Sequence, residues 1–162
     1  MAEAFLENED AIREVVHKFE ACQYAPEEFT HSHHLTVACW YLCTRDRPEA
    51  FVRMRSGLKR FIAHYGKQGY HETITRFWME LLAAYLEDLP AEMSLVSKVN
   101  RAVERYGSKQ ILFSYYTRAR VMSDAAKQDW IAPDLQSIAH RKTFCRPTKS
   151  RSSPNQAQTK KA

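Results

Sequence analysis

Apolar residues recur every three or four positions along most of the chain, and no long segment alternates apolar and polar residues. The first pattern is typical of helices that bury one face, whereas strict alternation is typical of strands. Proline and glycine residues interrupt the periodic segments and mark their ends. The sequence therefore predicts an all-α protein.

Four periodic segments separated by short links fill the first half of the chain, at about 9–22, 31–44, 48–65 and 71–89. Short links between helices favour an antiparallel four-helix bundle. Further helices are expected at about 94–106, 109–118 and 123–130, packed on that bundle, because their apolar residues need cover from water. A chain of 162 residues suits one helical domain, which we place at 1–139.

The last part of the chain, 140–162, has a different composition. It holds seven basic residues and no acidic ones, whereas residues 1–139 hold 17 basic and 19 acidic residues. The net charge of +5 therefore comes from this segment, which is also rich in serine, proline and glutamine. We expect a disordered basic tail with no specific recognition of nucleic acid.

Several classes of protein are excluded by what the sequence lacks. Its four glycines form no cluster, which excludes the glycine-rich phosphate loops of nucleotide-binding proteins. No apolar run approaches the length of a transmembrane segment, and the acidic N-terminus does not resemble a secretion signal. We therefore expect a cytoplasmic protein with reduced cysteines. Nothing in the sequence assigns an oligomeric state.

Three histidines lie on buried faces of the expected helices. At about 100° per residue, His31 and His34 fall on the same face of the second helix as the apolar residue Leu35. On the fourth helix, His71 and Thr75 share the face of the apolar residues. His33 points the opposite way, and we expect it to be a solvated surface residue.

In an up-down bundle the second and fourth helices begin at the same end of the molecule, so these three histidines would meet there. Three imidazoles predict a site for a divalent transition metal such as zinc, iron or manganese, where a bound water could be activated for chemistry on a small molecule. His31, His34 and His71 would be the ligands. Candidate general bases are Glu28 and Glu72, and residues that could add a hydrogen bond at the site are Tyr70 and Thr75.

Three other interpretations fit the same residues. The histidines could be core residues with backbone or hydroxyl partners. They could line a metal-free pocket, where two helix N-termini help to bind an anionic small molecule or an acidic group of a partner. The chain could instead be an interaction protein that uses exposed aromatic residues among Trp40, Tyr41, Tyr115 and Tyr116. A zinc-protease motif is excluded because Thr75 stands where HExxH requires its second histidine.

Three motifs together resemble a family of small, uncharacterised, mainly bacterial helical proteins. They are FxHxxHL at 29–35, YHxTxT at 70–75 and the segment WIAPDL at 130–135. The resemblance covers about residues 10–138. It implies that His31, His34 and His71 are motif positions, together with Thr73 or Thr75, and that His33 is a variable one. The family supplies no activity to carry over.

Overall fold

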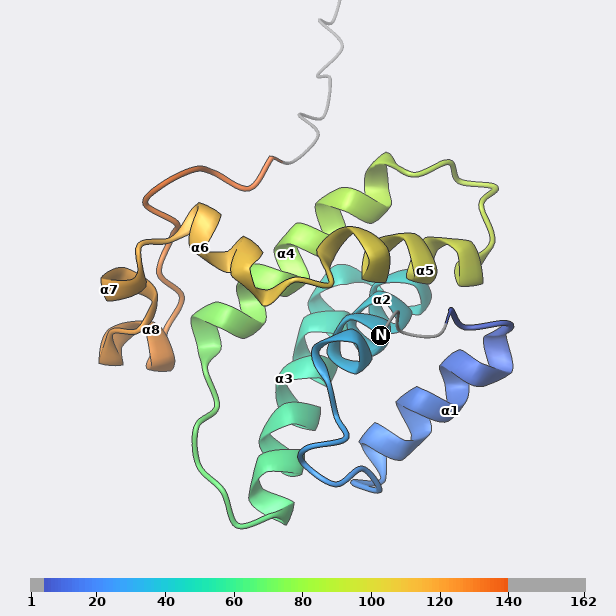
Figure 1. The fold of residues 1–162 in the computed structure, drawn as a ribbon, viewed down its shortest axis with the longest axis horizontal. Helices are drawn as coiled ribbons and strands as arrows, with labels where there is room; N and C mark the ends of the chain where they lie inside the picture. Colours follow the sequence, from blue (N-terminus) through green and yellow to red (C-terminus); the bar gives the residue numbers. More distant parts are fainter. Residues whose placement is uncertain (1–4, 140–162) are drawn as a thin grey trace, which may run out of the picture.

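The computed structural model describes residues 5–139, which form helices joined by short links (Figure 1). The five long helices are α1 (Glu9–Glu20), α2 (His31–Thr44), α3 (Arg47–His64), α4 (Glu72–Asp88) and α5 (Leu95–Tyr106). A 3₁₀ turn, η1 (Lys109–Ile111), and three short helices follow: α6 (Leu112–Tyr115), α7 (Arg118–Val121) and α8 (Asp124–Gln128). The predicted all-α class is confirmed, and residues 5–139 contain no strand.

The expected basic tail, 140–162, lies outside the described residues. None of the helices between residues 5 and 139 combines the length and the apolar composition that crossing a membrane requires.

Short polar side chains begin the long helices by accepting hydrogen bonds from backbone N–H groups that the helix itself leaves without a partner. Asn8 accepts from the Ala11 amide at 2.9 Å. At the start of α2 the backbone N–H of Thr30 donates to Nδ1 of His33 at 3.1 Å. The prediction that His33 is a solvated surface residue therefore holds only in part. Its ring is half-buried and fixes the first turn of α2.

Helix α2 lies at the centre of the molecule, with α1, α3, α4 and α5 arranged around it (Figure 1). The sequence predicted one buried stripe on α2, but α5 covers the side that would have faced water. Apolar residues beyond a single stripe of α2 are consequently buried, among them Leu35, Val37, Ala38, Cys39 and Tyr41.

A second apolar cluster joins α4 to the short helices near the C-terminal end of the described residues. Phe77 and Leu81 from α4 pack there with Leu112, Tyr116 and Val121. Tyr116 is fully buried, and Tyr41 of the first cluster is 3% exposed. The hypothesis of exposed aromatic residues is therefore wrong for these two tyrosines.

The contact between α1 and α3 depends on Gly57, which lies against the ring of Phe19. A β-carbon at Gly57 would lie 2.6 Å from Cε1 and 2.8 Å from Cζ of that buried ring. We expect Gly57→Ala to lower the free energy of unfolding by about 1 to 3 kcal/mol, because overpacking outweighs the better helix propensity of alanine. Urea denaturation checks this, with Ser56→Ala at the exposed neighbouring position as the control. Equal stability of Gly57→Ala and wild type would contradict the packing.

Candidate functional site

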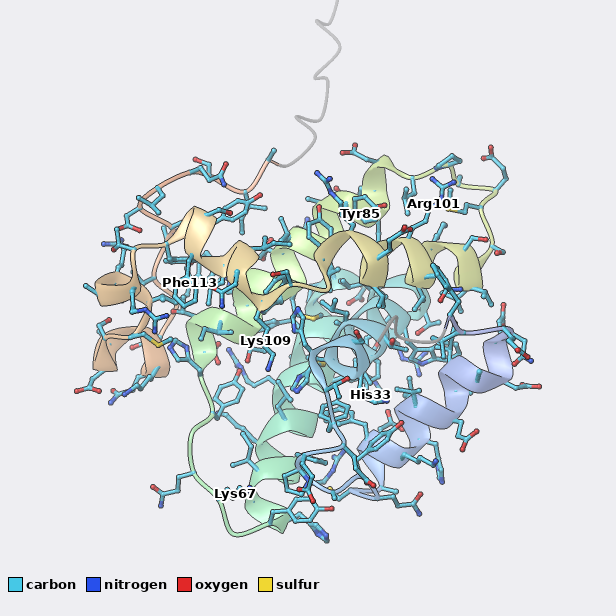
Figure 2. The ribbon with its side chains drawn as sticks, in the orientation of Figure 1. His33, Lys67, Tyr85, Arg101, Lys109 and Phe113 are labelled. Carbon is cyan, nitrogen blue, oxygen red and sulfur yellow. The ribbon has the colours of Figure 1, made fainter. Side chains whose placement is uncertain are left out.

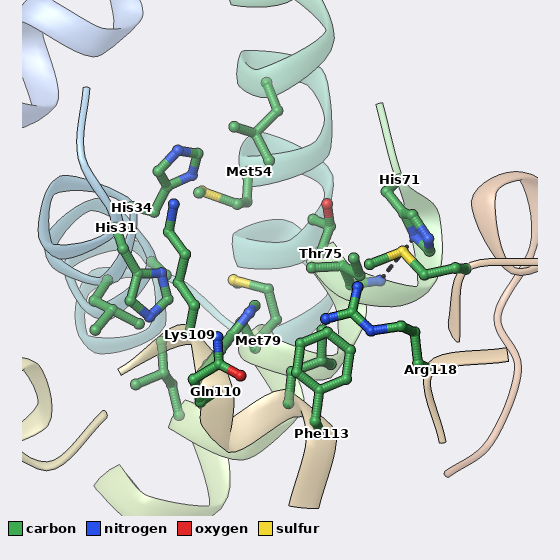
Figure 3. Close-up of a pocket in the computed structure, with 18 residues that line it drawn as sticks. His31, His34, Met54, His71, Thr75, Met79, Lys109, Gln110, Phe113 and Arg118 are labelled. Atoms are coloured by element: carbon green, nitrogen blue, oxygen red, sulfur yellow. Dashed lines mark hydrogen bonds between the residues drawn. The ribbon is translucent and has the colours of Figure 1, made fainter. Parts of the chain in front are cut away.

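A cavity of about 480 Å³ lies between the helical core and the segment that follows α5 (Figure 3). Helices α2, α3 and α4 form one part of its wall, and residues from 109–122, here called the cover segment, form the rest. His31, His34 and His71 all line this cavity, as the helical angles predicted. Thr75 lines it as well.

His31 attaches the end of α5 to the core. Its Nε2–H donates to the carbonyl oxygen of Tyr106 at 3.0 Å. The ring also meets the indole of Trp78 edge-on, with the ring centroids 4.6 Å apart. His31 thus holds the chain in place just before the cover segment begins.

His71 connects α4 to the cover segment. Its Nδ1 accepts from the Ile74 amide at 3.2 Å and so caps α4. Because Nδ1 is the acceptor, the ring proton is on Nε2, which donates to the carbonyl oxygen of Val121 at 2.8 Å. Burial lowers the pKa of His71, which favours this neutral form. Both ring nitrogens are therefore used in structural hydrogen bonds.

His34 differs from the other two histidines because its ring forms no hydrogen bond with any residue of the described part, 5–139. The ring packs against Phe29, with centroids 4.3 Å apart. Its pKa is lowered to about 3, first by burial and then by the neighbouring charges of His31 and Lys109. At neutral pH it is a neutral imidazole on the cavity wall, with one donor and one acceptor to offer.

The lowered pKa of His34 makes stability dependent on pH. The unfolded chain takes up a proton near pH 6.5, whereas the folded chain resists protonation down to about pH 3. Stability is therefore fully present above pH 6.5 and falls as the solution is acidified, by about 2 kcal/mol between pH 6.5 and 5.

Urea denaturation across this pH range measures the effect. The slope of the free energy of unfolding against pH should become smaller in His34→Gln. The matched control is His17→Gln, at an exposed position on α1. An unchanged slope in His34→Gln would contradict the assignment.

The two glutamates expected as general bases do not line the cavity. Glu28 accepts from the Ala25 amide at 2.9 Å and closes the turn before α2. Glu72 is buried in an ion pair with Arg55 of α3 and also accepts from the Tyr70 hydroxyl at 2.7 Å. Glu72 thus contacts α3 through Arg55 and does not line the cavity. Tyr70, expected to support the site, is likewise part of this ion-pair cluster and not of the cavity wall.

A three-histidine metal centre would require side chains to move from the positions they have in residues 5–139. In the described residues, no three His, Cys, Asp or Glu side chains are placed to share one metal ion. To bind a metal, His71 would have to release a helix cap or its bond to Val121. The predicted ligands therefore share a cavity but not a coordination geometry.

The cover segment brings two cations to the cavity that the sequence analysis did not single out. Lys109 and Arg118 line it and are exposed at its edge, and neither forms an ion pair within residues 5–139. The guanidinium of Arg118 lies 4.6 Å above the ring of Phe113. None of the eighteen lining residues is acidic. The cavity thus has positive groups and no carboxylate to neutralise them.

The other motif residues have structural partners. Thr73 is fully buried, and its hydroxyl donates to the Asp129 carbonyl at 2.6 Å and accepts from the Ile131 amide at 3.1 Å. Asp134 accepts from the backbone N–H and the hydroxyl of Thr117, at 2.8 and 2.6 Å. Thr73 thus fixes the chain that follows the cover segment against α4. Asp134 of the WIAPDL segment fixes the same stretch of chain to the cover segment.

Comparison of the chain with family models, curated proteins and solved structures finds no significant match. The resemblance to a bacterial helical family stays a prediction. The function is therefore argued from the cavity alone.

Proposed function

We propose that this protein is a binding module whose cavity holds a small molecule with an anionic group, without the help of a metal. The observation that carries the proposal is the presence of Lys109 and Arg118 on a cavity wall that contains no acidic residue. Without a carboxylate partner, such cations attract anions and can form charge-assisted hydrogen bonds with them. The cavity volume of about 480 Å³ is within the range of about 300 to 1,000 Å³ that is typical of small-molecule sites.

The distribution of polarity favours a ligand with an apolar body. Lys109 and Arg118 are exposed, whereas the deeper walls consist of buried apolar side chains such as Leu35, Met79 and Leu82. An apolar part of the ligand gains by leaving water there, while its charged group stays at the cations. Small carboxylates with aliphatic or aromatic bodies have this character.

Binding is favoured over catalysis by the positions of the carboxylates. Glu28 and Glu72 are held elsewhere by their own hydrogen bonds, so neither supplies a general base to the cavity. The histidines nearest a bound ligand are neutral or engaged with backbone carbonyls.

A thermal-shift titration of the full chain with octanoate tests the proposal. We expect octanoate to raise the melting temperature of wild type, because a ligand that binds only the folded state stabilises it by about 2.7 kcal/mol at a hundred times its Kd. Lys109→Met or Arg118→Met should reduce the shift, depending on which cation holds the carboxylate, whereas Arg101→Met, at an exposed position on α5 away from the cavity, should not (Figure 2). No shift in wild type, or equal shifts in all variants, would contradict the proposal.

A metal site remains the second candidate, supported by the fact that the three histidines line one cavity. Zinc, iron or manganese would then bind after a rearrangement of His71. Elemental analysis of the untagged protein and of His71→Ala tests this directly. Stoichiometric metal in wild type that is lost in the variant would support a metal centre, and no metal after incubation with these ions would count against it.

A further inference from the structure

The polar residues of the cavity fall into two groups on opposite sides. Figure 3 shows His31, His34 and Lys109 on one side and His71, Thr75 and Arg118 on the other. Each group therefore contains one permanent cation. The two cations come from different parts of the cover segment, η1 and α7.

Each cation has a neighbouring group that can add a hydrogen bond. The imidazole of His34 lies near Lys109, close enough for the two charges to repel when both are protonated. On the other side, Thr75 lies beside Arg118 on the cavity wall. The guanidinium of Arg118 stacks over Phe113, which leaves its N–H edges available for a planar anion.

Apolar side chains form most of the wall between the two groups, and the amide of Gln110 lies beside them. Met54 and Met79 lie there in Figure 3, and each is only 4% exposed. Thioether side chains adapt to the shape of an apolar ligand and offer it no strong hydrogen bond. A polar group in the middle of a ligand would therefore lose its water and find few partners in return.

As Lys109 and Arg118 are placed in Figure 3, on opposite sides of the cavity, one carboxylate does not contact both. We infer that the ligand carries two anionic groups separated by an apolar spacer, one bound by Lys109 and the other by Arg118. This inference rests on the proposed function and specifies its ligand class. The straight-chain dicarboxylates are the simplest members of that class.

Calorimetric titration of the full chain with dicarboxylates from succinate to sebacate, and with monocarboxylates of matched length, tests the inference. We expect one chain length to bind best, because the spacer must match the separation of the two cations. At that length the dicarboxylate should bind about tenfold more tightly than its matched monocarboxylate, since it forms a second charge-assisted contact.

Two variants separate the two ends. Lys109→Met and Arg118→Met should each reduce the affinity for the best dicarboxylate to that for its monocarboxylate, whereas Arg101→Met should leave the tenfold difference in place. Circular dichroism checks that the variants fold. If monocarboxylates bind and dicarboxylates of every length bind no better, the inference is overturned while the proposed function stands. If no carboxylate binds, both are overturned.

Discussion

Replacing His71 by alanine is expected to lower the free energy of unfolding by about 2 to 4 kcal/mol, because two interactions are lost together. The first is the cap of α4, in which Nδ1 accepts from the Ile74 amide at 3.2 Å. The second is the bond from Nε2 to the carbonyl oxygen of Val121, a fully buried residue. Alanine leaves the carbonyl oxygen of Val121 without a hydrogen-bond donor. A buried carbonyl without a donor destabilises the fold by more than the net contribution of an ordinary hydrogen bond. Urea denaturation of wild type and variant gives the difference.

The control for this prediction is His71→Asn. Asparagine is a good N-cap but is too short to replace the contact of Nε2 with Val121, so it should restore part of the stability. A metal-binding role predicts a different result, because asparagine would not replace imidazole as a ligand and the loss would disappear in protein stripped of metal. Equal stability of His71→Ala and wild type in the presence of a chelator would contradict the structural role.

Replacing Thr73 by valine is expected to lower the free energy of unfolding by about 2 to 4 kcal/mol, although the two side chains have nearly the same shape. The Thr73 hydroxyl serves two backbone groups at once, the carbonyl of Asp129 and the amide of Ile131. Thr73 is fully buried, so neither group regains water without local opening. We expect the loss to concentrate in the C-terminal part of the domain, as faster hydrogen exchange at residues 112–131 than at α2.

Thr75→Val is the matched control because it makes the same chemical change at the other threonine of the YHxTxT motif, two residues further along α4. Thr75 lines the cavity and does not form the bonds to residues 129 and 131, so its loss should cost less than that of Thr73. An equal loss of unfolding free energy in Thr73→Val and Thr75→Val would show that the hydroxyl of Thr73 has no special role in holding the C-terminal segment.

Much of the fold could be predicted from the periodicity of apolar residues. The expected segments match α1 to α5 to within two residues at each end, since proline, glycine and capping residues mark the ends locally. The same periodicity placed His31, His34 and His71 on inward faces. Periodicity does not reveal how many neighbours surround a helix, so α2 was expected to bury a stripe but buries residues around most of its circumference.

The rest of the site depends on contacts between segments far apart in the chain. The hydrogen bonds of His31 and His71 to Tyr106 and Val121 join positions 75 and 50 residues apart, and no local pattern indicates them. Lys109 and Arg118 lie in helical pieces of three and four residues, which are too short for a periodic signal. Glu72 was expected at the histidines as a general base, but its ion pair with Arg55, 17 positions earlier on α3, holds it outside the cavity.

Calorimetric titration of octanoate into chelator-treated full-length protein, with and without added zinc, tests the central claim most directly. The account predicts saturable binding at one site per chain that weakens as the salt concentration rises and is the same with and without zinc. Binding that is absent from the metal-free protein and appears only when zinc is added would contradict it, and would establish the three histidines as a metal centre.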